Sequence, residues 1–78
     1  GALDISFNEA RKIVGENEHM SVGERKEITD KIDQIEEIFK TPDTKKNKWE
    51  KMRPYVIWST GKNADTAMII LSLVLKIN

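Results

Sequence analysis

The segment KKNKWEKMRPYVIW contains the residues of this chain whose types and spacing come nearest to a binding chemistry. It interleaves cations with aromatic rings, an arrangement in which cations can meet phosphates while rings stack on bases. A nucleic-acid surface over residues 45–62 is therefore an alternative hypothesis. Its candidate contacts are Lys45, Lys46, Lys48, Lys51, Arg53 and Lys62. The competing interpretation is a core role for the rings, because Trp49, Met52 and Val56 step by three and four residues. A formal net charge of zero also gives no overall field toward a polyanion.

Other residues that could do chemistry lack the partners that a reaction needs. The segment STGKNADT and the residues before it differ in two places from the P-loop pattern G-x-x-x-x-G-K-[ST]. Val56 occupies the position of the first glycine, and Asn63 follows the lysine. His19 is the single histidine, and we interpret it as an exposed loop residue without a catalytic partner. One histidine and no cysteine argue against a zinc site. We therefore expect no enzyme activity, no metal and no cofactor.

Two capping boxes, in which a serine precedes a glutamate by three residues, predict the starts of two helices. The first helix, SFNEARKIVG, begins at Ser6 and closes at Gly15, where we expect a left-handed backbone. The second helix covers residues 21–40 and begins at Ser21. It carries one narrow apolar stripe, made by Ile28, Ile32, Ile35 and Phe39. A stripe this narrow is typical of a seam with one or two neighbouring helices.

A third helix is predicted over residues 42–58, with Thr41 as its N-cap and Pro42 in its first turn. The short connection favours an antiparallel hairpin with the second helix. Charge favours the same pairing, because the first 40 residues hold ten acidic and six basic side chains and the remainder three and seven. Pro54 either ends or kinks this helix, and the run YVIWST leaves a short strand open as an alternative.

The most apolar part of the chain is its end, AMIILSLVLKIN, which we predict to be a helix over residues 63–77 after a break at Gly61. A membrane span needs about 20 apolar residues, and this run is about half that, so we expect no membrane. A helix that is apolar on most sides is buried on most sides. It is either the central helix of its own domain or a helix shared with a second copy or another protein. The candidate interface residues are Ile70, Leu73, Ile77, Ile28 and Ile32.

The length of 78 residues predicts one small domain. We expect an all-α fold, a three- to four-helix bundle with an antiparallel helical hairpin and a buried apolar C-terminal helix. Gly1 and Ala2 are interpreted as left over from cloning, and the remainder as a piece of a larger protein. The absence of cysteine is compatible with a cytoplasmic location.

The order of signals from Ile35 onward is an acidic helix ending in IEEIFKTPD, a basic helix with tryptophan, and then GKNADTAMIILSLVLKI. This order resembles helical C-terminal segments of bacterial proteins from prophages and abortive-infection loci, over about half of the chain. The resemblance implies an accessory or assembly segment attached to a separate effector domain, and it transfers no functional residue. With the surplus of apolar surface on the last helix, it predicts a non-catalytic interaction or oligomerisation module.

Overall fold

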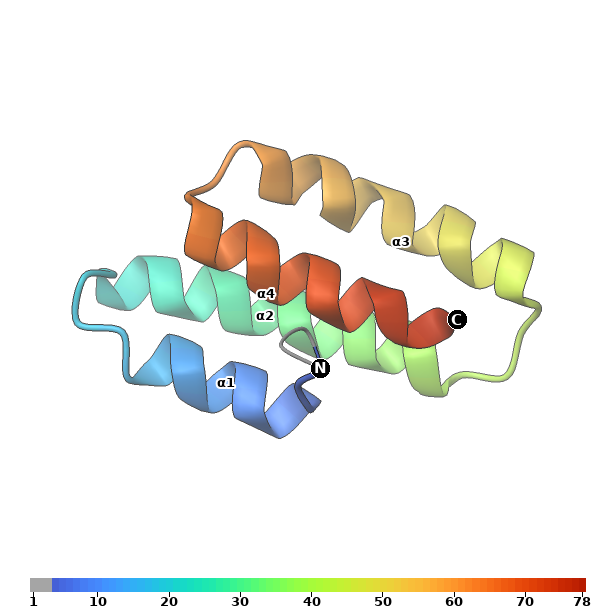
Figure 1. Cartoon of the computed structure of the whole chain (residues 1–78), viewed down its shortest axis with the longest axis horizontal. Coiled ribbons are helices and arrows are strands. Elements are labelled where there is room, and N and C mark those ends of the chain that lie inside the picture. The colour runs from blue at the N-terminus through green and yellow to red at the C-terminus, as the bar shows by residue number, and fades with distance from the viewer. Residues whose placement is uncertain (1–3) are drawn as a thin grey trace.

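The computed structural model describes residues 4–78, which form four α-helices and a closing 3₁₀ turn (Figure 1). The elements are α1 (Phe7–Gly15), α2 (Val22–Lys40), α3 (Lys45–Thr60), α4 (Ala64–Val74) and η1 (Leu75–Ile77). This part of the chain holds no strand, so the all-α prediction is confirmed and the strand alternative for YVIWST is wrong. The interpretation of Gly1 and Ala2 lies outside the described residues.

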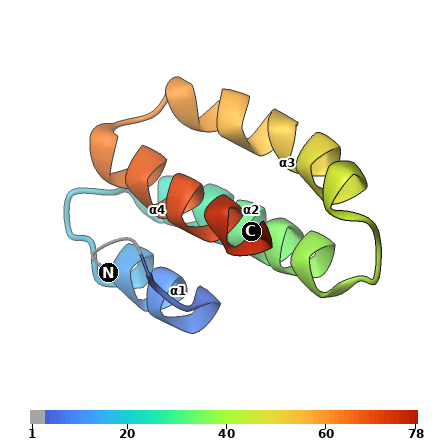
Figure 2. The ribbon, with the colours of Figure 1, turned by 45° about the vertical axis from the view of Figure 1, so that its right-hand side comes forward.

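Successive helices run in opposite directions, and α4 lies over α2 with α1 on one side and α3 on the other (Figures 1 and 2). The helix pairs in contact include α1 with α2, α2 with α3, and α4 with both α2 and α3. The predicted antiparallel hairpin is therefore present as α2 and α3. This arrangement buries the inner side of α4 and leaves its opposite side without a cover from the described helices.

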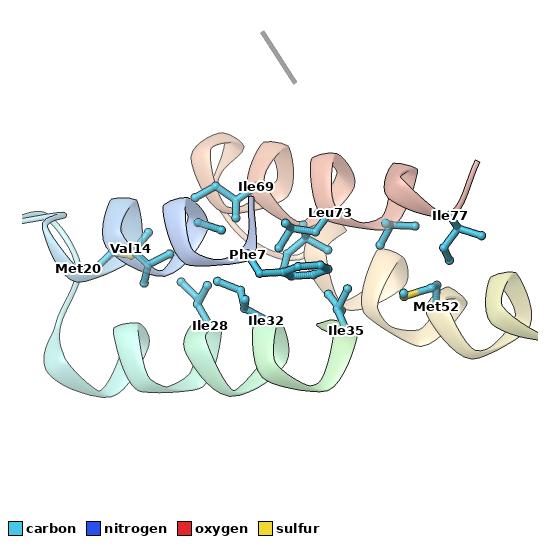
Figure 3. Close-up of a cluster of buried hydrophobic side chains, with 13 residues drawn as sticks. Phe7, Val14, Met20, Ile28, Ile32, Ile35, Met52, Ile69, Leu73 and Ile77 are labelled. Carbon is cyan, nitrogen blue, oxygen red and sulfur yellow. The ribbon is translucent and has the colours of Figure 1, made fainter. Parts of the chain in front are cut away.

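Apolar side chains from all four helices meet between α2 and α4. Figure 3 shows Phe7 of α1, Ile32 and Ile35 of α2, Met52 of α3 and Leu73 of α4 gathered there. Four of these five side chains are completely buried, and Phe7 keeps 8% of its surface exposed. Burial of one such side chain contributes about 1.5–3 kcal/mol, so this cluster is the main source of stability.

The helix starts follow the predicted caps. The side chains of Ser6 and Ser21 accept hydrogen bonds from the backbone N–H groups of Glu9 and Glu24, which complete both capping boxes. The prediction for Gly15 is wrong, because no described glycine has a positive φ. The chain instead leaves α1 through further right-handed turns, since Glu16 (φ −93°) donates its N–H back to the carbonyl of Lys12.

The connection between α2 and α3 differs from the prediction. Thr41 is the C-cap of α2 and donates its hydroxyl to the carbonyl of Glu37, at 2.8 Å. Its extended backbone suits a residue that precedes proline, so Pro42 lies in the connection and not in a helix. The N-cap of α3 is Thr44, which accepts from the N–H of Asn47 at 3.1 Å.

The carboxylate of Asp43 holds this connection together. It accepts hydrogen bonds from the side chain of Asn47 (2.9 Å), from Lys51 Nζ (2.9 Å) and from the backbone N–H of Thr44 (2.8 Å). These bonds, the one from Asn47 foremost, lower the pKa of Asp43 from 3.8 to about 2. They favour the ionised carboxylate. Because they bind Asp43 to residues in the first two turns of α3, they also fix the start of α3 at Lys45, after a connection of four residues.

Stability should therefore fall in acid partly through Asp43. A carboxylate with a lower pKa in the folded chain stabilises the fold above its ordinary pKa, and this contribution is lost as the pH falls from 3.8 toward 2. We expect Asp43→Asn to flatten the pH dependence of the urea midpoint in that window. Equal slopes for Asp43→Asn and the unmodified chain would contradict this role.

Pro54 lies inside α3, and the helix continues past it to Thr60. Its ring removes one backbone hydrogen bond and presses on the carbonyl of Glu50. Pro54 is exposed, so the helix bends away from solvent and toward the core. Figure 2 shows α3 bowed over the other helices in this sense.

Candidate functional site

The helix α4 is apolar on two opposite sides. Its inner side holds Thr66, Ile69, Ile70, Leu73 and Val74, all of them buried. Its outer side carries Ala64, Met68 and Leu71, and Leu75, the first residue of η1, continues the line. We name these four exposed residues the outer stripe. The exposed fractions of Met68, Leu71 and Leu75 are 51%, 39% and 45%. No charged side chain interrupts the outer stripe along its three turns.

The structure places the five sequence-predicted interface residues in the core of the chain itself. Ile70, Leu73 and Ile32 are completely buried, and Ile28 and Ile77 keep only 4% and 6% of their surface exposed. The folded chain therefore presents none of them to a partner. The apolar surface that remains available lies on the other side of α4, in the outer stripe.

The inner side of α4 faces the core because its side chains have the larger apolar surface area. It offers the side chains of Ile69, Ile70, Leu73 and Val74, and η1 extends it with Ile77. The outer stripe has only three large side chains and one alanine. Since the stabilisation grows with the apolar area removed from water, the larger side is buried and the smaller remains outside.

The helices α3 and α1, which lie on the two sides of α4, each carry a surface feature of their own (Figure 1). On α3, which packs alongside α4, a hollow of about 410 Å³ is lined by Trp49, Glu50, Arg53 and Val56. Trp49 and Val56 also pack against the core, so the apolar part of this hollow is held in place by the fold. On the α1 side, Lys76 Nζ lies 5.7 Å from the centre of the Phe7 ring. An apolar centre with charges at its margins is the anatomy of a protein interface.

The six basic residues of the nucleic-acid hypothesis do not form one free patch. Lys48 Nζ donates to the carbonyl of Phe39 at 2.6 Å, and Lys51 pairs with Asp43 at 2.9 Å. Lys62 Nζ lies 3.0 Å from Glu27 and 5.0 Å from the centre of the Trp58 ring. Within residues 4–78, the other three (Lys45, Lys46 and Arg53) take part in no ion pair.

The aromatic rings of this segment are half-buried and pack against the core. The hydroxyl of Tyr55 donates to Gln34 of α2 at 2.8 Å, and Lys31 Nζ lies 6.0 Å and 5.5 Å from the rings of Tyr55 and Trp58. These contacts anchor α3 on α2 through cation–π attraction. The core interpretation of the rings is thus confirmed. Nucleic-acid binding stays a prediction, which oligonucleotide titration at low salt checks.

The best-connected ion cluster is structural. Arg11 of α1 binds Glu36 and Asp33 of α2, with N–O distances of 2.6 Å and 2.9 Å. The hydrogen bond with Glu36 raises the pKa of Arg11, and the hydrogen bond from Arg11 lowers the pKa of Glu36. The cluster therefore holds α1 against α2 as ionised partners.

Sites of other kinds are not evident in the described part of the chain. His19 is exposed, as predicted, and its backbone N–H donates to the side chain of Asn17 at 2.9 Å. Residues 4–78 contain no cluster of three or more potential metal-binding side chains. None of their helices combines the length and the hydropathy that a membrane crossing requires.

Comparisons with models of protein families, with curated proteins and with solved structures found no match for this chain. The outer stripe is the feature from which a function can be inferred.

Proposed function

We propose that this chain is a non-catalytic protein-interaction module, and that its outer stripe packs against an apolar face of a protein partner. One observation carries the proposal. Ala64, Met68, Leu71 and Leu75 follow one another by four, three and four residues, and all are exposed. That spacing is the one with which a helix forms a seam against another helix.

The area of a stable interface indicates how much of this chain's surface the partner has to cover. Full burial of a large apolar side chain contributes about 1.5–3 kcal/mol, and the three large residues of the outer stripe are already about half buried. A stable interface covers about 800 Å² on each partner, which compares with 5138 Å² of accessible surface on this chain. The partner therefore extends beyond α4, and the hollow around Trp49 and Val56 on α3 offers the next apolar contact.

The setting of the proposal is an accessory or assembly segment of a larger bacterial protein that acts in the cytoplasm. It is supported by the resemblance of residues 35–77 to helical C-terminal segments from prophages and abortive-infection loci. In that setting the helical domain would hold a separate effector domain near its partner and perform no reaction itself.

Site-specific cross-linking tests this function. A photoreactive amino acid would replace Leu71 of the outer stripe or, as a control, Val22, which is 79% exposed in the first turn of α2. In the cell of origin we expect one discrete protein adduct from position 71 and none from position 22. The adduct should disappear when Met68→Asp is added. Equal adducts from both positions, or none from position 71, would contradict the proposal.

A further inference from the structure

We infer that the partner is a second copy of this chain, bound so that the two α4 helices pack antiparallel across their outer stripes. This inference rests on the proposed function and names its partner. Two independent features of α4 support it, one of size and one of charge.

The side-chain sizes along the outer stripe are complementary to those of a second outer stripe that runs in the opposite direction. The stripe begins with a small residue, Ala64, and ends with a large one, Leu75. An antiparallel pair centred between residues 69 and 70 sets Ala64 of each copy against Leu75 of the other. It also sets Met68 of each copy against Leu71 of the other. Each contact then joins side chains that fill the space between the axes, which lie about 8–10 Å apart in packed helices.

Charge at the margin of the stripe favours the same direction. Lys76 lies on the side of α4 that faces α1, because its Nζ reaches the Phe7 ring. Asp65 precedes it by eleven residues, nine of them steps of α4 and the last two steps of the 3₁₀ turn η1. These steps together make close to three full turns, so Asp65 lies on the same side. In an antiparallel twofold pair each side of a helix meets the same side of its partner. Asp65 of each copy then comes next to Lys76 of the other, at both ends of the interface.

A parallel pair has neither advantage. It would set Ala64 against Ala64 and leave a gap at one end, with Leu75 crowded against Leu75 at the other. It would also turn the α1 side of one copy toward the α3 side of the other, which separates Asp65 from Lys76. Either pair would have twofold symmetry, so the contact is closed and limited to two copies.

The dimer also extends the contact beyond α4. With the symmetry axis across the helices, the side of α4 on which α3 lies (Figure 1) would meet the same side of the other copy. The hollow lined by Trp49, Glu50, Arg53 and Val56 lies on α3 and offers additional area with opposite charges. Because weak and transient complexes have interfaces at the small end of the range, we expect a reversible dimer.

Disulfide cross-linking tests the direction of packing, since the chain has no cysteine of its own. A disulfide forms only where two Cα atoms come within about 7 Å. In the antiparallel pair the two copies of Ala64 are about 16 Å apart, the length of eleven helical residues. We expect Ala64→Cys mixed with Leu75→Cys to give a mixed dimer at least tenfold faster than Ala64→Cys forms a dimer alone. The opposite ranking would overturn the antiparallel arrangement.

Sedimentation equilibrium of the whole chain tests the self-association. We expect a reversible dimer that Leu71→Asp weakens at least tenfold and the control Val22→Asp, at an exposed position in the first turn of α2, by less than twofold, with helical content unchanged in both. We also expect Asp65→Lys mixed with Lys76→Asp to associate more tightly than either variant alone. A strict monomer, together with an adduct from position 71 to a different protein, would overturn this inference and leave the proposed function standing. A dimer that Leu71→Asp does not weaken would place the contact elsewhere on the chain and would also overturn this inference.

Discussion

Leu73→Ala should lower the free energy of unfolding by about 2–5 kcal/mol, whereas Leu71→Ala should lower it by no more than about 1 kcal/mol. The two leucines lie two residues apart on α4, yet Leu73 is completely buried and Leu71 is 39% exposed. Truncation of Leu73 removes its apolar contacts and leaves a cavity between α4 and α2, and truncation of Leu71 leaves none. Urea unfolding followed by circular dichroism measures both values.

This comparison separates the two sides of α4 with a chemically identical change. A domain of this size has about 5–15 kcal/mol of stability in total, so Leu73→Ala would bring it close to unfolding at room temperature. Equal losses for the two variants, measured at a protein concentration where the chain is monomeric, would mean that α4 is buried on both sides. The assignment of the outer stripe as a free surface would then be wrong.

Pro54→Ala should raise the stability by about 2 kcal/mol. A proline inside a helix destabilises it by about 3 kcal/mol. Its removal also gives the unfolded chain more conformational entropy, which lowers the stability by about 0.4–1 kcal/mol and offsets part of the gain. Pro54 is exposed, so the substitution leaves no cavity. In a domain of this size such a gain corresponds to a rise of roughly 8–16 °C in Tm, which a thermal melt resolves.

The matched control is Arg53→Ala, an exposed position in the same turn of α3. It should change the stability by less than about 0.5 kcal/mol, because it alters no backbone hydrogen bond. A lower stability of Pro54→Ala would show that the bend at Pro54 is needed to bring Trp49 and Ser59, at opposite ends of α3, against the core.

Local signals in the sequence were sufficient for most of the fold. The two capping boxes at Ser6 and Ser21 bind their N3 backbone N–H groups as predicted, and Asn63 caps α4 at 2.9 Å from the N–H of Thr66. The stripe of Ile28, Ile32 and Ile35 on α2 is buried. Such signals act within one turn of helix, so they can be read before any tertiary contact is known.

The start of α3 could not be located in the same way. Thr41 and Thr44 are both able to cap a helix, and Pro42 is compatible with a first turn. The choice depends on the carboxylate of Asp43, which binds Lys51 two turns further on. A contact at that range involves several residues at once and leaves no short pattern in the sequence.

The orientation of α4 was the other feature that periodicity could not supply. A helix with apolar residues on two opposite sides has two possible inner faces, and the pattern alone does not choose between them. The choice follows from the larger apolar area of Ile69, Ile70, Leu73 and Val74. How much of that area is buried depends on how these side chains pack against α2. The candidate interface consequently fell on the core residues Ile70 and Leu73, and the outer stripe was found from the structure.

Methionine oxidation tests most directly whether the outer stripe is open in the single chain and covered in the complex. The chain has three methionines, of which Met68 is 51% exposed, while Met20 and Met52 keep 4% and 0%. In dilute solution we expect peroxide to oxidise Met68 at least tenfold faster than the other two. At concentrations where the chain associates, oxidation of Met68 should slow and that of Met20 and Met52 should not change. A Met68 that is protected in the dilute chain, or that reacts equally fast in the associated one, would contradict the account.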